Sequence, residues 1–595
     1  MMNRRKLIQS TGTSLALAGQ STMGFARAAE AAWLGAQGDH PWNCPRRPCR
    51  FQDLNMKIIS RFKTFLGTAC VLLATLCFCP YSNAALWLPH SLSDHILFQQ
   101  GERLALWGKA APHSEIIAEI SNEESGAIID TASAFTDADG HWELALKPLH
   151  ASFKKYTIKI TGDGDTRLIH DALVGELWLS CGQSNMELRL RFILGGRNLM
   201  ASAAHDGLRI FYQDNANVAW RQGVSKTPVD DTVNGRWLSA ISATNVANCS
   251  GVAYTFALAL YDALNKNGKE VPVGVMNSAV GATAVESWMS RAAMESDPQL
   301  KAKLPANWNV GNWARYNQPM NQPTALFNLK IAPLTRHSVR GFIWYQGEGN
   351  AGSGMAGEKY YQTAMAALIH DWRQQWGGQP RPFVLSQLAA FDANGKMPPE
   401  DLESWAYLRE AQFEVAQAVP QTAAIPIHDV PLTWNTGDFD YKSPVHPLDK
   451  KPVGERMALA ARSLVYGEAV EYLGPVYERM EIKGEKVVLH FQHAQGLKPG
   501  GGGRLLGFAL CGADRHFVEA EARIVGEVVE LSNLQVKTPV AVTYAFTSMN
   551  HAANLFNGHD LPAYPFRTDQ VKSDFLKGST AMEAEAALTR AASSK

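Results

Sequence analysis

Apolar and polar positions follow three different patterns along the chain. Residues 85–170 contain short, partly alternating runs separated by Asp- and Gly-rich turns, which are typical of the strands of a small β-sandwich-like domain. From 171 to 467, continuous apolar runs alternate with segments of helical spacing, which predicts a mostly parallel sheet flanked by helices. Residues 468–570 return to strand-like runs and predict a β-rich domain. The tail 571–595 is polar and alanine-rich, and we expect it to be flexible.

The middle pattern also predicts individual elements. Apolar residues at helical spacing predict helices, and short continuous apolar runs predict buried strands. The predicted helices cover 252–264, 361–376 and 451–466, and the predicted strands cover 177–181, 271–277, 341–345 and 382–388.

Two leader-like segments precede these patterns. Residues 56–84 combine a basic start, a short apolar core and small residues ending at Ala84, which predicts a secretory signal peptide. Residues 1–55 contain Arg4 and Arg5 and are similar to a twin-arginine leader, or they are an over-long gene prediction with translation starting at Met56. We therefore expect a periplasmic or secreted protein without stable membrane insertion after cleavage of the signal.

Composition narrows the class of protein. With 56 basic and 56 acidic side chains the net charge is zero, which argues against nucleic acid as a partner. Of eight cysteines, only Cys181, Cys249 and Cys511 follow the predicted signal, and this odd number is not a disulfide framework, although one bridge is allowed. No Cys/His spacing predicts a metal site, and we expect no cofactor.

Three motifs carry the candidate chemistry. The strand at 177–181 leads into CGQSNM at 181–186, which places a serine hydroxyl on a turn at a strand's carboxyl end. Such ends form the crevice in which open α/β sheets hold their chemistry, and a serine there can act as a nucleophile. The other motifs are WYQGEGNA at 344–351 and HPLDKKPVGERMAL at 446–459.

Together these motifs resemble those of the sialate O-acetylesterase-like family of SGNH (GDSL-type) hydrolases, whose usual forms are SGQSNM, WYQGESNA and HPxxKxxVGxRLAL. The resemblance extends from about residue 86 to about residue 569. It implies an α/β fold, the SGNH-hydrolase-type three-layer sandwich with a mostly parallel sheet, flanked by N-terminal and C-terminal β-rich domains. It also implies a secreted serine esterase that removes O-acetyl groups from a carbohydrate such as acetylated sialic acid, xylan or xyloglucan.

The resemblance assigns two catalytic residues and leaves the third open. Ser184 corresponds to the nucleophile and His446 to the general base. The family usually places an aspartate two or three residues before this histidine, where the present chain has Pro444 and Ser443. Either Asp440 orients His446 after a loop rearrangement, or a backbone carbonyl holds the ring in a Ser–His dyad.

The resemblance also assigns donors for the oxyanion of a tetrahedral intermediate. The stretch NSAVGAT at 277–283 is similar to the family's NSSWGGT, so Gly281 corresponds to a donor, together with the N–H of Ser184. A side-chain amide from Gln346 is the third candidate, with Asn350 as the alternative. Gln346 could equally fasten its own loop. Supporting roles fall to Gln183 and Glu348.

Two other functions remain open from the sequence. The missing aspartate is compatible with a catalytically weakened carbohydrate-binding protein. A lipase or phospholipase of the same superfamily is the second alternative, and it would require a long apolar groove for the acyl chain.

Overall fold

The computed structural model describes residues 85–569, apart from 214, 216–224, 233, 306–318, 353, 392–403, 433–442 and 551. The leader-like segments 1–55 and 56–84 and the tail 571–595 lie outside the described residues. All described residues belong to one compact unit, Ser82–Lys595. Within them, no helix has both the length and the apolar character that a membrane span requires.

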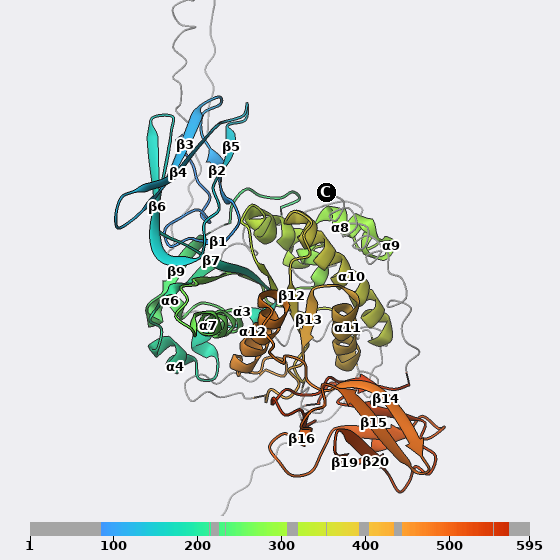
Figure 1. Ribbon diagram of the computed structural model, residues 1–595. Helices are drawn as coiled ribbons and strands as arrows, with labels where there is room; N and C mark the ends of the chain where they lie inside the picture. The colour runs from blue at the N-terminus through green and yellow to red at the C-terminus, as the bar shows by residue number, and fades with distance from the viewer. Residues whose placement is uncertain are drawn as a thin grey trace, which may run out of the picture. The chain divides into compact units, whose positions relative to one another are not determined.

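The central sheet has the strand order β13-β12-β11-β7-β10-β8-β9. Figure 1 labels its strands β7, β9, β12 and β13. All neighbours along this path are parallel except β9, which is antiparallel to β8. This mixed, mostly parallel sheet agrees with the α/β class that the alternating pattern predicted. The strands are β7 Asp165–Gly182, β8 His205–Gln213, β9 Gly235–Ala240, β10 Val273–Ala279, β11 Gly341–Tyr345, β12 Phe383–Ser386 and β13 Thr422–Ile425.

Helices cover both faces of the sheet. Ile343 of β11 lies in one apolar core with helices α7 and α12, whereas its neighbour Trp344 lies in a separate core with α10 and α11. Successive side chains of a strand point to opposite faces, so the two cores lie on the two sides of the sheet. The helices are α7 Gly251–Asn265, α10 Gly354–Gln375, α11 Ser404–Ala418 and α12 Lys451–Tyr466. The predicted helices 252–264, 361–376 and 451–466 are thereby confirmed.

Strand β7 joins the N-terminal strands to the central sheet. Its first half pairs with β6 and β1, and its second half pairs with β10 and β11. The domain boundary suggested by the sequence, between 170 and 171, therefore lies inside one continuous strand. The N-terminal strands are β1 Leu97–Gln99, β2 Leu104–Lys109, β3 Glu115–Asn122, β4 Ile128–Phe135, β5 His141–Leu146 and β6 Ser152–Gly162.

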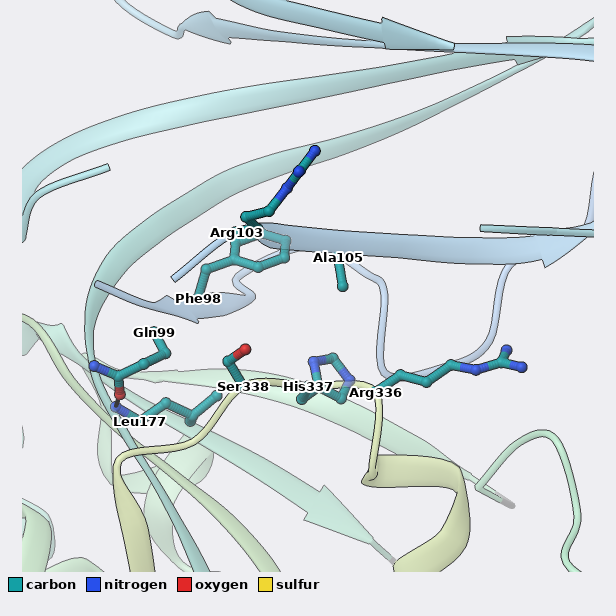
Figure 2. Close-up of a pocket in the computed structure, with 8 residues that line it drawn as sticks. All are labelled: Phe98, Gln99, Arg103, Ala105, Leu177, Arg336, His337 and Ser338. Carbon is teal, nitrogen blue, oxygen red and sulfur yellow. Dashed lines mark hydrogen bonds between the residues drawn. The ribbon is translucent and has the colours of Figure 1, made fainter. Parts of the chain in front are cut away.

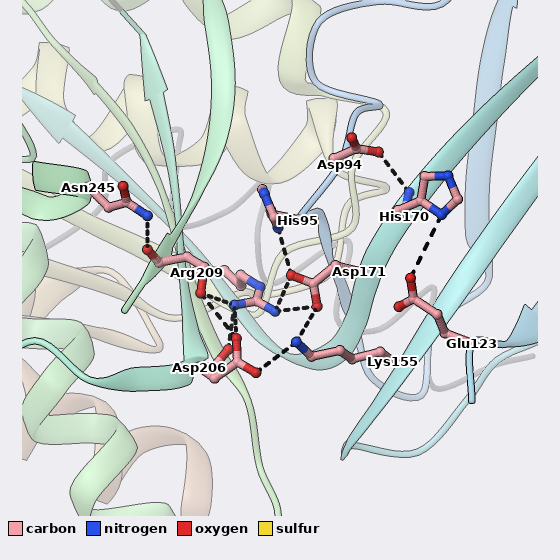
Figure 3. A network of polar contacts seen from close by, with 10 residues as sticks. Asp94, His95, Glu123, Lys155, His170, Asp171, Asp206, Arg209 and Asn245 are labelled. Atoms are coloured by element: carbon pink, nitrogen blue, oxygen red, sulfur yellow. Dashed lines mark hydrogen bonds and ion pairs between the residues drawn. The ribbon is translucent and has the colours of Figure 1, made fainter. Parts of the chain in front are cut away.

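Ion pairs fasten this junction. Asp171 of β7 accepts hydrogen bonds from the fully buried Arg209 of β8 at 2.9 and 3.0 Å (Figure 3). Lys155 of β6 lies 3.0 Å from the same carboxylate and 2.8 Å from Asp206. The pairing compensates the buried guanidinium and ties the N-terminal strands to the central sheet.

A small cavity lies at the same junction. Figure 2 shows Phe98 and Ala105 of the N-terminal strands near Leu177 of β7 and the buried His337. Its volume is about 10 Å³, room for one water molecule at most, so it is not a substrate site.

The C-terminal residues form a separate apolar core of their own between short antiparallel sheets. One sheet has the order β14-β15-β20-β19, a second has the order β18-β17-β21-β23, and β16 pairs with β22. The strands are β14 Val476–Lys483, β15 Lys486–Gln492, β16 Lys498–Pro499, β17 Phe508–Cys511, β18 Val518–Glu519, β19 Glu521–Val525, β20 Val528–Ser532, β21 Ala541–Tyr544, β22 Leu555–Phe556 and β23 Phe566–Arg567.

Short helical segments connect the larger elements. They are α3 Ser184–Glu187, η2 Leu190–Phe192, α4 Gly196–Ala201, α6 Ala243–Val246, η3 Val285–Trp288, α8 Arg291–Ser296, α9 Pro298–Lys301, η5 Pro319–Asn321, η6 Phe327–Ile331 and η7 Ala332–Leu334. The described cysteines, Cys181, Cys249 and Cys511, are buried free thiols, so none of them forms a disulfide. Burial raises the pKa of Cys249 to about 12, which makes it unreactive.

Candidate active site

The three sequence motifs meet at one edge of the central sheet. β10 and β11 are the parallel neighbours of β7, and Gly182 pairs with Ala279 on one side and Tyr345 on the other. The carboxyl ends of these three strands therefore lie next to one another. The loops that follow β7, β10 and β11 carry Ser184, Gly281 and Gln346, respectively.

Gly182 allows the sharp turn that presents Ser184. Its φ angle is 148°, and a Cβ atom added there would lie 2.1 Å from the carbonyl oxygen of Tyr345. Only glycine fits so close an approach between neighbouring backbones. The chain then enters α3, in which Ser184 is the first residue.

Ser184 and His446 form a hydrogen bond although they are 262 positions apart in the sequence. The Ser184 Oγ atom lies 2.7 Å from His446 Nε2. On the other side of the ring, His446 Nδ1 lies 2.5 Å from the hydroxyl oxygen of Ser443. Asp440, the predicted acid, lies outside the described residues. Asp429, another carboxylate before His446, forms an ion pair with Arg456 at 2.6 Å.

Burial sets the protonation state of His446. Desolvation, and then the charge of Lys450, lower the pKa of His446 to about 3. The imidazole is therefore neutral at pH 7, with a nitrogen lone pair available to accept the Ser184 proton. This is the state that a general base needs.

The low pKa of His446 predicts an unusual pH profile. For a histidine with the ordinary pKa of 6.5, the fraction of neutral imidazole would fall about 25-fold between pH 7 and pH 5. His446 stays neutral over this range, so we expect kcat/KM to fall much less than that. Lys450, whose pKa burial lowers to about 7, is the group expected to titrate here. Initial rates between pH 4.5 and 8 test this, and a 25-fold fall centred near 6.5 would contradict it.

Gly281 lies beside the nucleophile, but its N–H already has an acceptor. A Cβ atom added to Gly281 would lie 3.3 Å from the Cβ atom of Ser184. The Gly281 N–H donates to Glu187 Oε2 at 2.7 Å, and Asn215 Nδ2 donates to Glu187 Oε1 at 2.9 Å. An oxyanion would therefore compete with the Glu187 carboxylate for this donor. The next residue, Ala282, has a φ angle of 57°, a strained conformation for a residue with a side chain.

Gln346 and Asn350 fasten their own loop. Gln346 is fully buried, and its Nε2 atom donates to the carbonyl oxygen of Thr283 at 2.9 Å and to Asn350 Oδ1 at 2.7 Å. Asn350 Nδ2 donates to Glu286 at 3.0 Å. Both N–H groups of Gln346 are thus used within the protein, which is the loop-fastening role that the sequence left open. Gln183 supports the same loop by accepting the Gly349 N–H at 3.0 Å.

Asn185 links all three motifs, a role that sequence reasoning missed. It is fully buried, and its Nδ2 atom donates to Glu348 Oε1 at 2.5 Å and to the carbonyl oxygen of Val445 at 2.9 Å. Its Oδ1 atom accepts from Lys450 Nζ at 2.5 Å. One amide thus joins the nucleophile turn, the Glu348 loop and the histidine loop. The only sequence signal for this linking role was that Asn185 and Lys450 each stand inside one of the motifs.

The two ionisable partners of Asn185 are enclosed by protein. Burial is the main effect on both groups: it lowers the pKa of Lys450 to about 7 and raises the pKa of Glu348. The charge of each opposes the shift of the other. Lys450 Nζ also lies 5.3 Å from the centre of the Tyr345 ring, a cation–π distance.

One cluster of carboxylates among the described residues has metal-like spacing. The oxygens of Glu358, Glu410 and Glu414 lie within 4.8 Å of one another. Arg567 pairs with Glu410 at 3.1 Å, and Gln362 donates to Glu414. Protein groups thus occupy this cluster, and we assign it no metal.

The chain is similar to known carbohydrate esterases. A family model described as carbohydrate esterase, sialic acid-specific acetylesterase, matches residues 174–461. A Homo sapiens sialate O-acetylesterase is 26% identical over 429 residues, which cover 68% of this chain and 75% of that protein. The Mus musculus sialate O-acetylesterase is 25% identical over 523 residues, covering 79% and 92%. The crystal structure of a carbohydrate acetylesterase from Xanthomonas citri is 33% identical, with a TM-score of 0.69, covering 82% of this chain and all (100%) of that one.

Proposed function

This chain belongs to the sialate O-acetylesterase family of carbohydrate esterases and is a carboxylic ester hydrolase, and from that premise we propose that it removes O-acetyl groups from carbohydrates through a serine nucleophile at position 184. The observation that carries this proposal is the 2.7 Å contact between Ser184 Oγ and His446 Nε2. It supplies a hydroxyl and a neutral base at the carboxyl edge of the sheet.

In the first half-reaction, Ser184 Oγ attacks the acetyl carbonyl carbon while its proton passes to His446 Nε2. The tetrahedral intermediate collapses when the bond between that carbon and the sugar oxygen breaks. The imidazolium returns the proton to the departing sugar oxygen. In the second half-reaction, water attacks the acetyl-enzyme with the same base, which releases acetate and restores the serine.

The oxyanion donors in this proposal are the N–H groups of Ser184 and Gly281. The carboxylate of Glu187 now holds the Gly281 N–H, so substrate would have to take over that donor. Gln346 and Asn350 act in this scheme by holding the neighbouring loop in place. The arrangement requires neither a metal nor an organic cofactor.

The acyl group is proposed to be acetyl because the nucleophile is closely surrounded. Gly281 packs against Ser184, and the polar side chains of Glu187 and His446 flank it. We expect kcat/KM for 4-nitrophenyl acetate to exceed that for the butyrate by at least about 10-fold, since each misplaced methylene costs up to a few kcal/mol. A rate maximum at butyrate or longer esters would favour the lipase alternative.

The sugar is the open part of the proposal. The mammalian relatives are named for sialate, and the Xanthomonas citri protein is named more broadly as a carbohydrate acetylesterase. An acetate-release assay on O-acetylated sialic acid, acetyl-xylan and acetylated xyloglucan decides between these classes. Binding of these ligands without any release of acetate would instead support the catalytically weakened binding protein.

The finer assignments of fold and location are also proposed. The parallel strands with helices on both faces support an SGNH-type three-layer sandwich for 171–467, with β-rich domains at 85–170 and 468–570 and strand β7 running through the first boundary. We propose that 56–84 directs export to the periplasm or the medium. N-terminal sequencing of the exported protein would test this, with Ala85 as the expected first residue.

A further inference from the structure

We propose that Ser443 is the positioning residue of this esterase, and that its neutral hydroxyl fixes the tautomer and orientation of His446 where the family usually has an aspartate. The inference rests on the proposed function, because it concerns the base of the same site. Ser443 stands three positions before His446, one of the two positions at which the related motifs carry the acid.

The contact between the two side chains is short and enclosed. Ser443 Oγ lies 2.5 Å from His446 Nδ1, and the two residues are only 5% and 7% exposed. Pro444 and Val445 form a tight turn between them, and the Val445 N–H lies 3.4 Å from the same hydroxyl oxygen. Asn185 holds the Val445 carbonyl oxygen at 2.9 Å. The hydroxyl is thus fixed relative to the nucleophile turn.

The donor and acceptor roles follow from the chemistry of the base. His446 Nε2 must be unprotonated to accept the Ser184 proton, so the single proton of the neutral ring lies on Nδ1. The Ser443 oxygen then accepts the Nδ1–H. This contact selects the productive tautomer, which is the orienting part of what an acid does in a Ser–His–Asp triad.

A hydroxyl cannot stabilise the imidazolium as the acid of a triad does, because it carries no charge. The imidazolium that forms during attack would be stabilised by a carboxylate, whereas Ser443 offers only its dipole. Among the residues that the structure describes, the charged groups bonded to Asn185 in this network are Lys450 on the histidine loop and Glu348 on the β11 loop. Lys450 disfavours a second positive charge nearby. We therefore infer that Ser443 orients His446 without adding a negative charge of its own.

Ser443→Ala tests the orienting role. We expect kcat for 4-nitrophenyl acetate to fall roughly 10- to 100-fold with KM changed less than about 2-fold, since Nδ1–H loses its acceptor while substrate contacts remain. Thr136→Val is the matched control: it removes a buried hydroxyl that donates to Ala111 at 2.6 Å in the N-terminal strands. We expect this control to keep the wild-type kcat.

Ser443→Asp tests the charge argument with a readout that simple packing would not change. A carboxylate next to Nδ1 should raise the pKa of His446, so the acid limb of the kcat/KM profile should move toward neutral pH by at least about one unit. Wild-type kcat in Ser443→Ala together with an unchanged profile in Ser443→Asp would overturn the inference. So would a large loss in Asp440→Asn, because that residue would then be the orienting acid. Melting temperatures and stoichiometric labelling of Ser184 by a phosphonate ester show that each variant is folded.

The proposed function and this inference fail in different ways. Full activity of a variant without the Ser184 hydroxyl would remove the serine mechanism itself. Loss of activity in that variant, with wild-type behaviour of both Ser443 variants, would remove only the role of Ser443.

Discussion

Replacing Ser184 by alanine is expected to lower kcat for acetate release by at least about 10⁴-fold, the scale on which serine hydrolases lose activity without their nucleophile. The hydroxyl bonds to His446 Nε2 at 2.7 Å, and without it no acetyl-enzyme can form. Alanine is a good helix former, and Ser184 is the first residue of α3, so the fold should tolerate the change. Acetate release from 4-nitrophenyl acetate and from an acetylated sugar gives the rates.

His446→Ala and the double variant complete this experiment. Because the two side chains act as one unit, the double variant should be no slower than Ser184→Ala alone. Mass spectrometry of rapidly quenched wild-type protein should find the added acetyl group on the peptide containing Ser184. Equal acetate release by wild type and Ser184→Ala would exclude the serine mechanism, and losses that multiply in the double variant would show that the two residues act independently.

Segments with a continuous or regularly spaced apolar pattern were predictable from the sequence. The strand at 177–181 lies within β7, those near 271–277, 341–345 and 382–388 are β10, β11 and β12, and the helix at 451–466 is α12. The apolar residues of these elements face the protein core, so the apolar pattern in the sequence marks the elements. Helix α11 was not predicted. Its buried side includes Arg409, Glu410 and Glu414, so polar residues interrupt the apolar period that marks an amphipathic helix.

The pairing of Ser184 with His446 was also predictable, because each residue stands in a motif of its own. The partner of the histidine was not, although Ser443 was visible as the residue in the position of the acid. A serine hydroxyl fits many roles, and only its 2.5 Å distance from Nδ1 distinguishes this one. The contacts of Asn185 were hidden for another reason. They join it to positions 163 and 265 residues away, and no local pattern encodes such separations.

Asn185→Leu is expected to lower the free energy of unfolding by about 4 kcal/mol, the cost of leaving a buried charged group without its partners. Leucine has nearly the same shape but no amide, so the enclosed Lys450 ammonium loses its acceptor and Glu348 loses its donor. The carbonyl oxygen of Val445 loses its hydrogen bond as well, which loosens the turn that carries His446. Urea unfolding monitored by tryptophan fluorescence measures the change.

Asn265→Leu is the matched control for this prediction. Asn265 also makes three hydrogen bonds through its side chain, but only to the backbone of Tyr261 and Val271 at the end of α7, and it is partly exposed. We expect it to cost about 1 kcal/mol and to leave phosphonate labelling of Ser184 unchanged, since neutral, partly solvated bonds contribute little. In Asn185→Leu the labelling should slow at least about 10-fold, because the base is no longer held against the nucleophile. If both variants lose the same stability and label at the wild-type rate, the amide of Asn185 does not organise the site, and the three motifs must be held together by packing alone.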